Sequence, residues 1–247
     1  MKWRFLAVIG AGICLFAGAT RAEDFVAFPA PQDWPVEQLK RYLNSVGRQQ
    51  LDDRARRIAG IRTREQAEQH RKAVREKVLK LLGGLPDDRG PLNTRRVGTL
   101  DRGDYRIEKV IYESQPGLYV PANVYVPARG NGPFPAILMP VGHGDDGKTS
   151  GQRQIAIGFA RKGFIALTYD PLGQGERLQH YDPDLRYSRV GMSTDQHTHD
   201  NGHTTLIGDN FARYRVWDGM RSIDYLITRK DVDPERIGCT GCSGGGT

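Results

Sequence analysis

The chain of 247 residues is long enough for one domain of fair size with an extension. Its hydrophobic fraction of 38% and its charged fraction of 26% are typical of a soluble globular protein. The formal net charge of +7 is spread through the N-terminal part without a basic patch interleaved with aromatic residues, which argues against a nucleic-acid-binding protein.

The first 22 residues have the pattern of a secretory signal peptide. Lys2 and Arg4 give a positive start, and the apolar run at 5–17 is shorter than the about 20 residues that a membrane-spanning helix needs. Small residues before and at Ala22 offer a cleavage site. We therefore expect a secreted or periplasmic protein that has no membrane attachment after cleavage, with a retained anchoring helix as the alternative.

Residues 23–92 are predicted to form a helical extension. Apolar residues recur at intervals of three and four between Trp34 and Leu82, and Lys and Arg separate them. The run Gly83-Gly84-Leu85-Pro86 is typical of a helix end. We expect two charged amphipathic helices that pack on the outside of the following domain.

Residues 93–247 are predicted to form an α/β domain. The first three strand patterns are separated by Gly and Pro and predict a small antiparallel meander. The next two strands are nearly all apolar and flank a helical pattern at 152–162, which is the order of a parallel strand–helix–strand unit. The predicted strands lie at 94–100, 105–112, 118–127, 135–141, 164–169 and 236–240.

Two further segments lie between the last two of these strands. Residues 176–209 are polar and are predicted to form a long irregular loop over the sheet. Residues 211–229 then show the periodicity of a strong amphipathic helix. The apolar stripe of this helix is predicted to be Phe211, Tyr214, Trp217, Met220, Ile223 and Ile227.

The last strand leads into the motif Gly241-Cys242-Ser243-Gly244-Gly245. This run fits the pattern G-x-S-x-G, in which a serine stands on a sharp strand-to-helix turn. The backbone at such a turn is strained, and the residues two before and two after the serine approach closely, so both must be glycine. The motif therefore predicts Ser243 as a nucleophile flanked by Gly241 and Gly245. A disordered glycine-rich tail is the alternative.

A serine nucleophile of this kind needs two amide donors for the developing oxyanion. The amide of Gly244, directly after the serine, is the first candidate. The second would come from the loop after the strand at 135–141, where Gly144 or Asp145 is the candidate. A simple turn at this loop is the alternative. Asp170 is expected to fix the turn after its own strand rather than to act on the serine.

The serine also needs a histidine base and an acid that orients it. In α/β domains that carry the G-x-S-x-G motif, the acid and the histidine both follow the serine in the chain. All six histidines of this sequence precede Ser243. We therefore expect the chain to be the N-terminal portion of a longer enzyme, inactive alone. Its last strand would be an exposed apolar edge that promotes aggregation.

These segments resemble a known family. The stretch at 212–247, with its long helix, its Asp-Pro-Glu-Arg strand start and its Ser-Gly-Gly-Gly elbow, is similar to the acetyl xylan esterase-like branch of the α/β-hydrolases, which includes cephalosporin-C deacetylases. Segments 140–144 and 169–176 also resemble loops of that group, and the likeness covers about 94–247. It implies an α/β-hydrolase fold and a serine esterase whose substrate is a small or carbohydrate ester, such as an acetylated polysaccharide. We expect no cofactor.

Two local patterns support other readings. Cys239 and Cys242 form a C-x-x-C pair that would be a redox site, although a buried small side chain beside the nucleophile is the simpler interpretation. In the alternative function, the chain is an exported, non-catalytic module that keeps the G-x-S-x-G turn without its activity, and His197, His199 and His203 bind zinc. A polar loop is the simpler interpretation of these histidines, and we expect no metal. The oligomeric state is left open.

Overall fold

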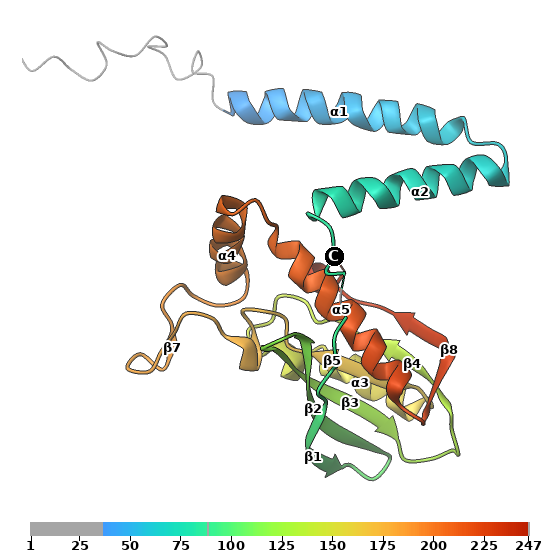
Figure 1. Cartoon of the computed structure of the whole chain (residues 1–247), viewed down its shortest axis with the longest axis vertical. Helices are drawn as coiled ribbons and strands as arrows, with labels where there is room; N and C mark the ends of the chain where they lie inside the picture. The colour runs from blue at the N-terminus through green and yellow to red at the C-terminus, as the bar shows by residue number, and fades with distance from the viewer. Residues whose placement is uncertain (1–36, 88, 247) are drawn as a thin grey trace, which may run out of the picture. The chain divides into compact units, whose positions relative to one another are not determined.

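The computed structural model describes residues 37–87 and 89–246 (Figure 1). The predicted signal peptide at 1–22 lies outside the described residues. The chain divides into two compact units, one ending at Gln69 and one starting at His70. The domain boundary expected between residues 92 and 93 stays a prediction. Among the helices described, none has both the length and the apolar character that crossing a bilayer requires.

The two predicted N-terminal helices are present as α1 (Gln38–Ala59) and α2 (Arg64–Leu81). A capping box precedes α2: the amide of Gln66 donates to Thr63 Oγ1 at 3.2 Å, and Gln66 Oε1 accepts from the amide of Thr63 at 3.2 Å. After α2, Gly84 adopts a φ of 82° and its amide donates to the Leu79 carbonyl at 2.8 Å. This left-handed closure explains why α2 ends at the glycine pair.

Six strands form one sheet in the order β1-β2-β3-β5-β4-β8. The pairs β1–β2, β2–β3 and β3–β5 are antiparallel, whereas β5–β4 and β4–β8 are parallel. The predicted meander and the predicted parallel unit are therefore both present, and they join where β3 pairs with β5. The strands are β1 (Arg95–Asp101), β2 (Tyr105–Gln115), β3 (Leu118–Pro127), β4 (Phe134–Leu138), β5 (Ile165–Tyr169) and β8 (Val232–Cys239).

Helices α3 (Arg153–Arg161) and α5 (Phe211–Thr228) cover opposite faces of this sheet. The core on the α5 side contains Val124, Leu138 and Leu167, and the core on the α3 side contains the next or preceding residues, Tyr125, Met139 and Ala166. Because successive side chains of a strand point to opposite faces, this alternation places the two helices on the two sides. Figure 1 shows α5 as the long helix crossing the sheet.

The segment predicted to be irregular contains a helix, α4 (Thr194–Leu206), after two short strands, β6 (Tyr181–Asp182) and β7 (Tyr187–Ser188). The prediction was wrong because α4 has no apolar stripe for periodicity to detect. It is anchored instead by the buried Gln196, whose side chain accepts from the Gln179 amide at 2.9 Å and donates to the Gly191 carbonyl at 2.7 Å.

The buried face of α5 also differs from the predicted stripe. Ile227 is 52% exposed, whereas Tyr225 and Leu226 are buried together with the polar Asp218 and Ser222. A three-residue step falls about 60° short of a full helical turn, so a stripe built from such steps drifts around the helix. The sheet therefore receives only part of the predicted stripe.

Candidate active site

Ser243 lies in a sharp turn directly after β8. Its φ is +55°, in the left-handed region that residues other than glycine rarely adopt, and the 3₁₀ turn Ser243–Gly245 begins at it. A β-carbon on Gly241 would overlap the carbonyl of Gly245, and one on Gly245 would overlap the carbonyl of Pro140. The strained serine and the two glycine contacts are the features that the sequence motif predicts.

The loop after β4 packs on this turn and brings His143 to the serine. His143 Nδ1 lies 2.5 Å from Ser243 Oγ and 3.4 Å from the amide nitrogen of Gly244, which donates to it. Partial desolvation of the ring lowers the pKa of His143, and the charge of Arg215 lowers it further. The neutral ring therefore has a lone pair available for the Ser243 hydroxyl.

The sequence did not predict this contact between His143 and Ser243. The two residues are 100 positions apart in sequence, and parallel pairing of β4 with β8 places the ends of both strands side by side. Chain order alone suggested that the base must follow the serine. The sheet register, which could have revealed the contact, cannot be read from the sequence.

Of the predicted oxyanion donors, the structure places the Gly244 amide at the serine, whereas Gly144 and Asp145 make other backbone hydrogen bonds. The amide of Gly244 faces His143, as described above, and so lies beside the serine hydroxyl. The amide of Gly144 donates instead to the carbonyl of Gly142 at 2.9 Å, and Asp145 is exposed, with its carbonyl accepting from the Gly175 amide at 2.9 Å. The role of Gly144 or Asp145 as the second donor therefore stays a prediction, and Gly144 would have to leave this turn to fulfil it.

Buried polar side chains hold the His143 loop in place. Gln174 Nε2 donates to the carbonyls of Gly142 at 2.8 Å and Gly144 at 2.5 Å. Asp170 is fully buried and accepts from the backbone of Lys148 at 2.7 Å and from its ammonium at 2.5 Å. Asp170 thus fixes the turns around it, as predicted.

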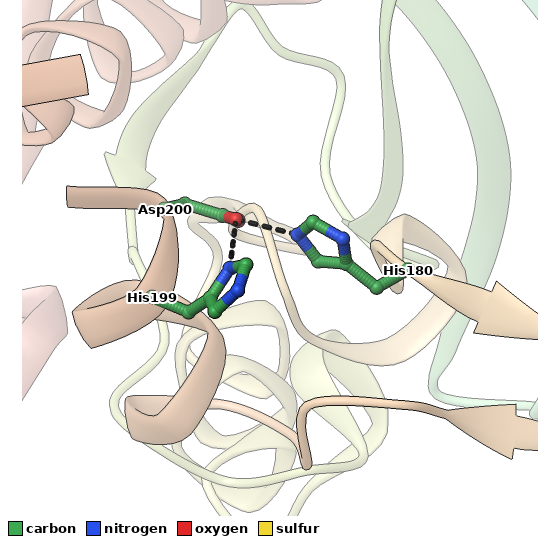
Figure 2. Close-up of side chains that lie close together, drawn as sticks. All are labelled: His180, His199 and Asp200. Carbon is green, nitrogen blue, oxygen red and sulfur yellow. Dashed lines mark hydrogen bonds and ion pairs between the residues drawn. The ribbon is translucent and has the colours of Figure 1, made fainter. Parts of the chain in front are cut away.

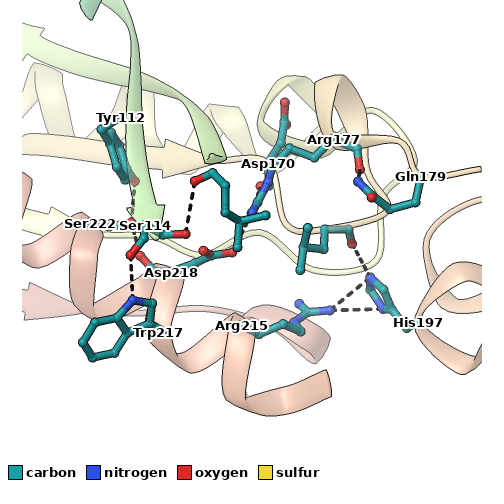
Figure 3. Close-up of polar contacts among 12 residues, drawn as sticks. Tyr112, Ser114, Asp170, Arg177, Gln179, His197, Arg215, Trp217, Asp218 and Ser222 are labelled. Carbon is teal, nitrogen blue, oxygen red and sulfur yellow. Dashed lines mark hydrogen bonds and ion pairs between the residues drawn. The ribbon is translucent and has the colours of Figure 1, made fainter. Parts of the chain in front are cut away.

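A second histidine lies beside the first. The rings of His143 and His197 have centroids 5.4 Å apart, and His197 Nε2 donates to the Leu172 carbonyl at 2.8 Å (Figure 3). Arg215 Nη1 lies 3.1 Å from His197 Nδ1, and its Nη2 donates to the Gly244 carbonyl at 3.1 Å. Burial and the guanidinium charge lower the pKa of His197 to about 4.

We expect the stability of the protein to decrease as the pH falls from 6.5 to about 4, in part because of His197. Its pKa is lower in the folded state, so the unfolded chain binds the extra proton over this interval and is favoured. His197→Gln retains an N–H donor for Leu172 but does not titrate, so it should reduce this slope. Urea midpoints measured against pH test this, and an unchanged slope in the variant would contradict it.

The other predicted site residues fall in two places. Cys239 and Cys242 are free and exposed, which corrects the expectation of a buried Cys239: β8 is the last strand at its edge of the sheet. The trio His197, His199 and His203 does not come together, because positions 197 and 199 are only two residues apart on α4 and point to different sides. His199 and His203 lie instead near His180, with ring centroids 4.7 and 6.3 Å from it.

Comparisons with known proteins agree with the family resemblance of the sequence. A family model described as acetyl xylan esterase (AXE1) matches residues 100–247. YtaP of Bacillus subtilis (strain 168), named as a hydrolase, is 25% identical over 183 residues, which are 70% of this chain and 56% of that protein.

Solved structures give the same fold. A Bacteroides fragilis NCTC 9343 protein described as an acetyl xylan esterase superposes with a TM-score of 0.61 at 21% identity, over 73% of this chain and 48% of that one. The methylesterase BT1017 superposes with a TM-score of 0.54 at 25% identity, over 77% and 39%. These matches confirm the predicted α/β-hydrolase fold, and the chain spans about half the length of the relatives it matches.

Proposed function

This chain belongs to the acetyl xylan esterase family, and from that premise we propose that Ser243 is the nucleophile of a carboxylic ester hydrolase. The observation that carries the proposal is the 2.5 Å contact between Ser243 Oγ and His143 Nδ1 on a strained turn after a parallel strand. A neutral imidazole within hydrogen-bond reach of a serine is the first requirement for activating its hydroxyl.

The proposed reaction begins with attack of Ser243 Oγ on the carbonyl carbon of the ester while the hydroxyl proton passes to the imidazole. The carbonyl oxygen becomes an oxyanion, and the amide of Gly244 is placed to stabilise it. Collapse of the tetrahedral intermediate returns the proton to the departing alcohol and leaves an acyl-serine, which water then hydrolyses. The oxyanion would displace the weak contact from the Gly244 amide to His143, at 3.4 Å.

We propose a small acyl group on a carbohydrate hydroxyl as the substrate class, with acetyl as the first choice. The family description and the acetyl xylan esterase among the structural relatives support this choice. The methylesterase relative supports testing methyl esters of carbohydrate acids as well. We also propose an exported, secreted or periplasmic protein, supported by the signal-peptide pattern of the sequence.

A complete charge relay also needs a carboxylate on the imidazole. Within the residues described, no carboxylate bonds to His143, so its ring is not held in one tautomer by an acid. We therefore propose that these residues supply the nucleophile, one oxyanion donor and, in His143, a proton acceptor without an orienting acid, so that the chain alone reacts slowly. In a Ser-His-Asp triad, loss of the orienting carboxylate alone lowers kcat by about 10⁴-fold.

The proposal is tested by labelling with a fluorophosphonate probe and mapping the modified residue by mass spectrometry. Slow labelling confined to Ser243 is expected, with none in Ser243→Ala and an unchanged rate in the control Ser45→Ala, whose exposed hydroxyl lies on α1. His143→Ala should lower the rate by about 100-fold if its ring accepts the proton. Labelling that persists in Ser243→Ala would refute the proposal that Ser243 is the nucleophile.

A further inference from the structure

A compact group of imidazoles and one carboxylate lies on α4 and on the segment before β6. His180 Nε2 is 2.6 Å from Asp200 Oδ1, and His199 Nδ1 is 3.4 Å from the same oxygen (Figure 2). The potential ligand atoms of these three residues all lie within 4.8 Å of one another. His203 adds a third ring, with its centroid 4.4 Å from that of His199.

The helix explains why these residues converge. His199 and His203 are four positions apart on α4, so both lie on the same side of it, one turn from each other. Asp200 is adjacent to His199. His180 approaches from the preceding segment, where its backbone has the unusual φ of +54° for a residue other than glycine. Figure 2 shows the three labelled side chains pointing toward one another from two separate chain segments.

We propose that His180, His199 and Asp200 bind a divalent transition metal of the zinc type, with the ring of His203 beside the site. Two or three imidazoles with one carboxylate form a donor set that suits zinc. With metal–ligand bonds of about 2.0–2.2 Å, the ligand atoms of a tetrahedral site lie about 3.3 Å apart. The two distances to Asp200 Oδ1 bracket this value, so small side-chain rotations suffice to form the site.

The exposure of the group also fits an ion that enters from solvent. The side chains of His180, His199 and Asp200 are 32%, 38% and 16% exposed. The bound metal would join α4 to the segment that begins after β5, and α4 also carries His197, whose Nδ1 faces Arg215 near the elbow. The proposed role is therefore structural: the ion holds α4 to the segment before β6, close to the residues around the serine.

The competing explanation is a set of hydrogen bonds that needs no metal, since Asp200 already accepts from His180. The two explanations differ in what the trio does with an added ion. A hydrogen-bonded cluster has no stoichiometric affinity for zinc, whereas a ligand set binds one ion per chain and stabilises the fold by RT ln(1 + [Zn²⁺]/Kd).

The experiment is equilibrium dialysis of the metal-stripped chain against ZnCl₂, with metal content measured by mass spectrometry and Tm measured with and without zinc. One ion per chain and a zinc-dependent rise in Tm are expected. His199→Ala and His180→Ala should each weaken zinc binding by at least about 100-fold and remove the rise in Tm. Circular dichroism without zinc establishes that each variant is folded.

Two matched variants make the test specific to this set. His70→Ala removes a histidine from α2, and His197→Ala removes the α4 histidine on the other side, so both should bind zinc like the parent chain. No stoichiometric zinc on the folded parent chain, or equal binding by folded His199→Ala and His180→Ala, would overturn the proposal. Because the readout is metal content, this result is independent of whether Ser243 reacts with the fluorophosphonate.

Discussion

Replacement of Gly245 by alanine is expected to destroy the serine turn and to lower fluorophosphonate labelling by at least about 100-fold, while destabilising the protein by about 3 kcal/mol. The new β-carbon would overlap the carbonyl oxygen of Pro140 and would lie 2.8 Å from its carbonyl carbon and 3.0 Å from that of Val141. All of these atoms belong to backbone, so no side-chain rotation relieves the clash. The loop that carries His143 or the turn that carries Ser243 has to move.

The matched control is Gly158→Ala in α3. A β-carbon there would meet no atom within 4 Å outside the neighbouring backbone of its own helix, and alanine is favoured over glycine inside a helix by about 1 kcal/mol. Labelling should be unchanged, and the urea midpoint should be equal or higher. Labelling of Gly245→Ala at the parent rate would show that close approach at the elbow is unnecessary, and the nucleophile proposal would lose its structural basis.

The turn at Ser243 shows which parts of the structure can be predicted from the sequence. The spacing of Gly241, Ser243 and Gly245 reports a local steric requirement, so the strained turn could be predicted from five residues. The strand order could be predicted only in part, as a meander followed by a parallel unit, because each unit has its own pattern. The pairing of β3 with β5 joins the units and leaves no local signal.

The polar contacts of the site were not predictable, because they depend on the packing of distant segments. His143 and Ser243 meet through the pairing of β4 and β8. The histidines of α4 separate into two sets because α4 is a helix, and its polar sequence gave no periodicity that would have predicted one. Had the segment at 194–206 been assigned as helical, the i and i+4 spacing of His199 and His203 would have favoured this pair over a set that includes His197.

Replacement of Asp218 by alanine is expected to give the largest loss of stability, about 3–5 kcal/mol, out of a total that is about 5–15 kcal/mol for a typical domain. Asp218 Oδ2 accepts from Arg177 Nη1 at 2.5 Å (Figure 3). The two side chains are 1% and 4% exposed. The pair joins α5 to the segment after β5. Without the carboxylate, the guanidinium of Arg177 stays buried with its charge uncompensated, and it retains the Asp170 carbonyl, at 3.1 Å, as an acceptor.

Urea unfolding separates this effect from an ordinary ion-pair loss. Asp104→Ala removes the partner of Arg161 in a pair whose side chains are 43% and 57% exposed, so the expected cost is below about 1 kcal/mol. The double variant Arg177→Met with Asp218→Leu removes both charges and should be more stable than Asp218→Ala alone. If Asp218→Ala cost no more than Asp104→Ala, burial of this pair would not govern the stability of the segment. Because Gln174 of that segment holds the His143 loop, loss of the pair should also slow labelling of Ser243.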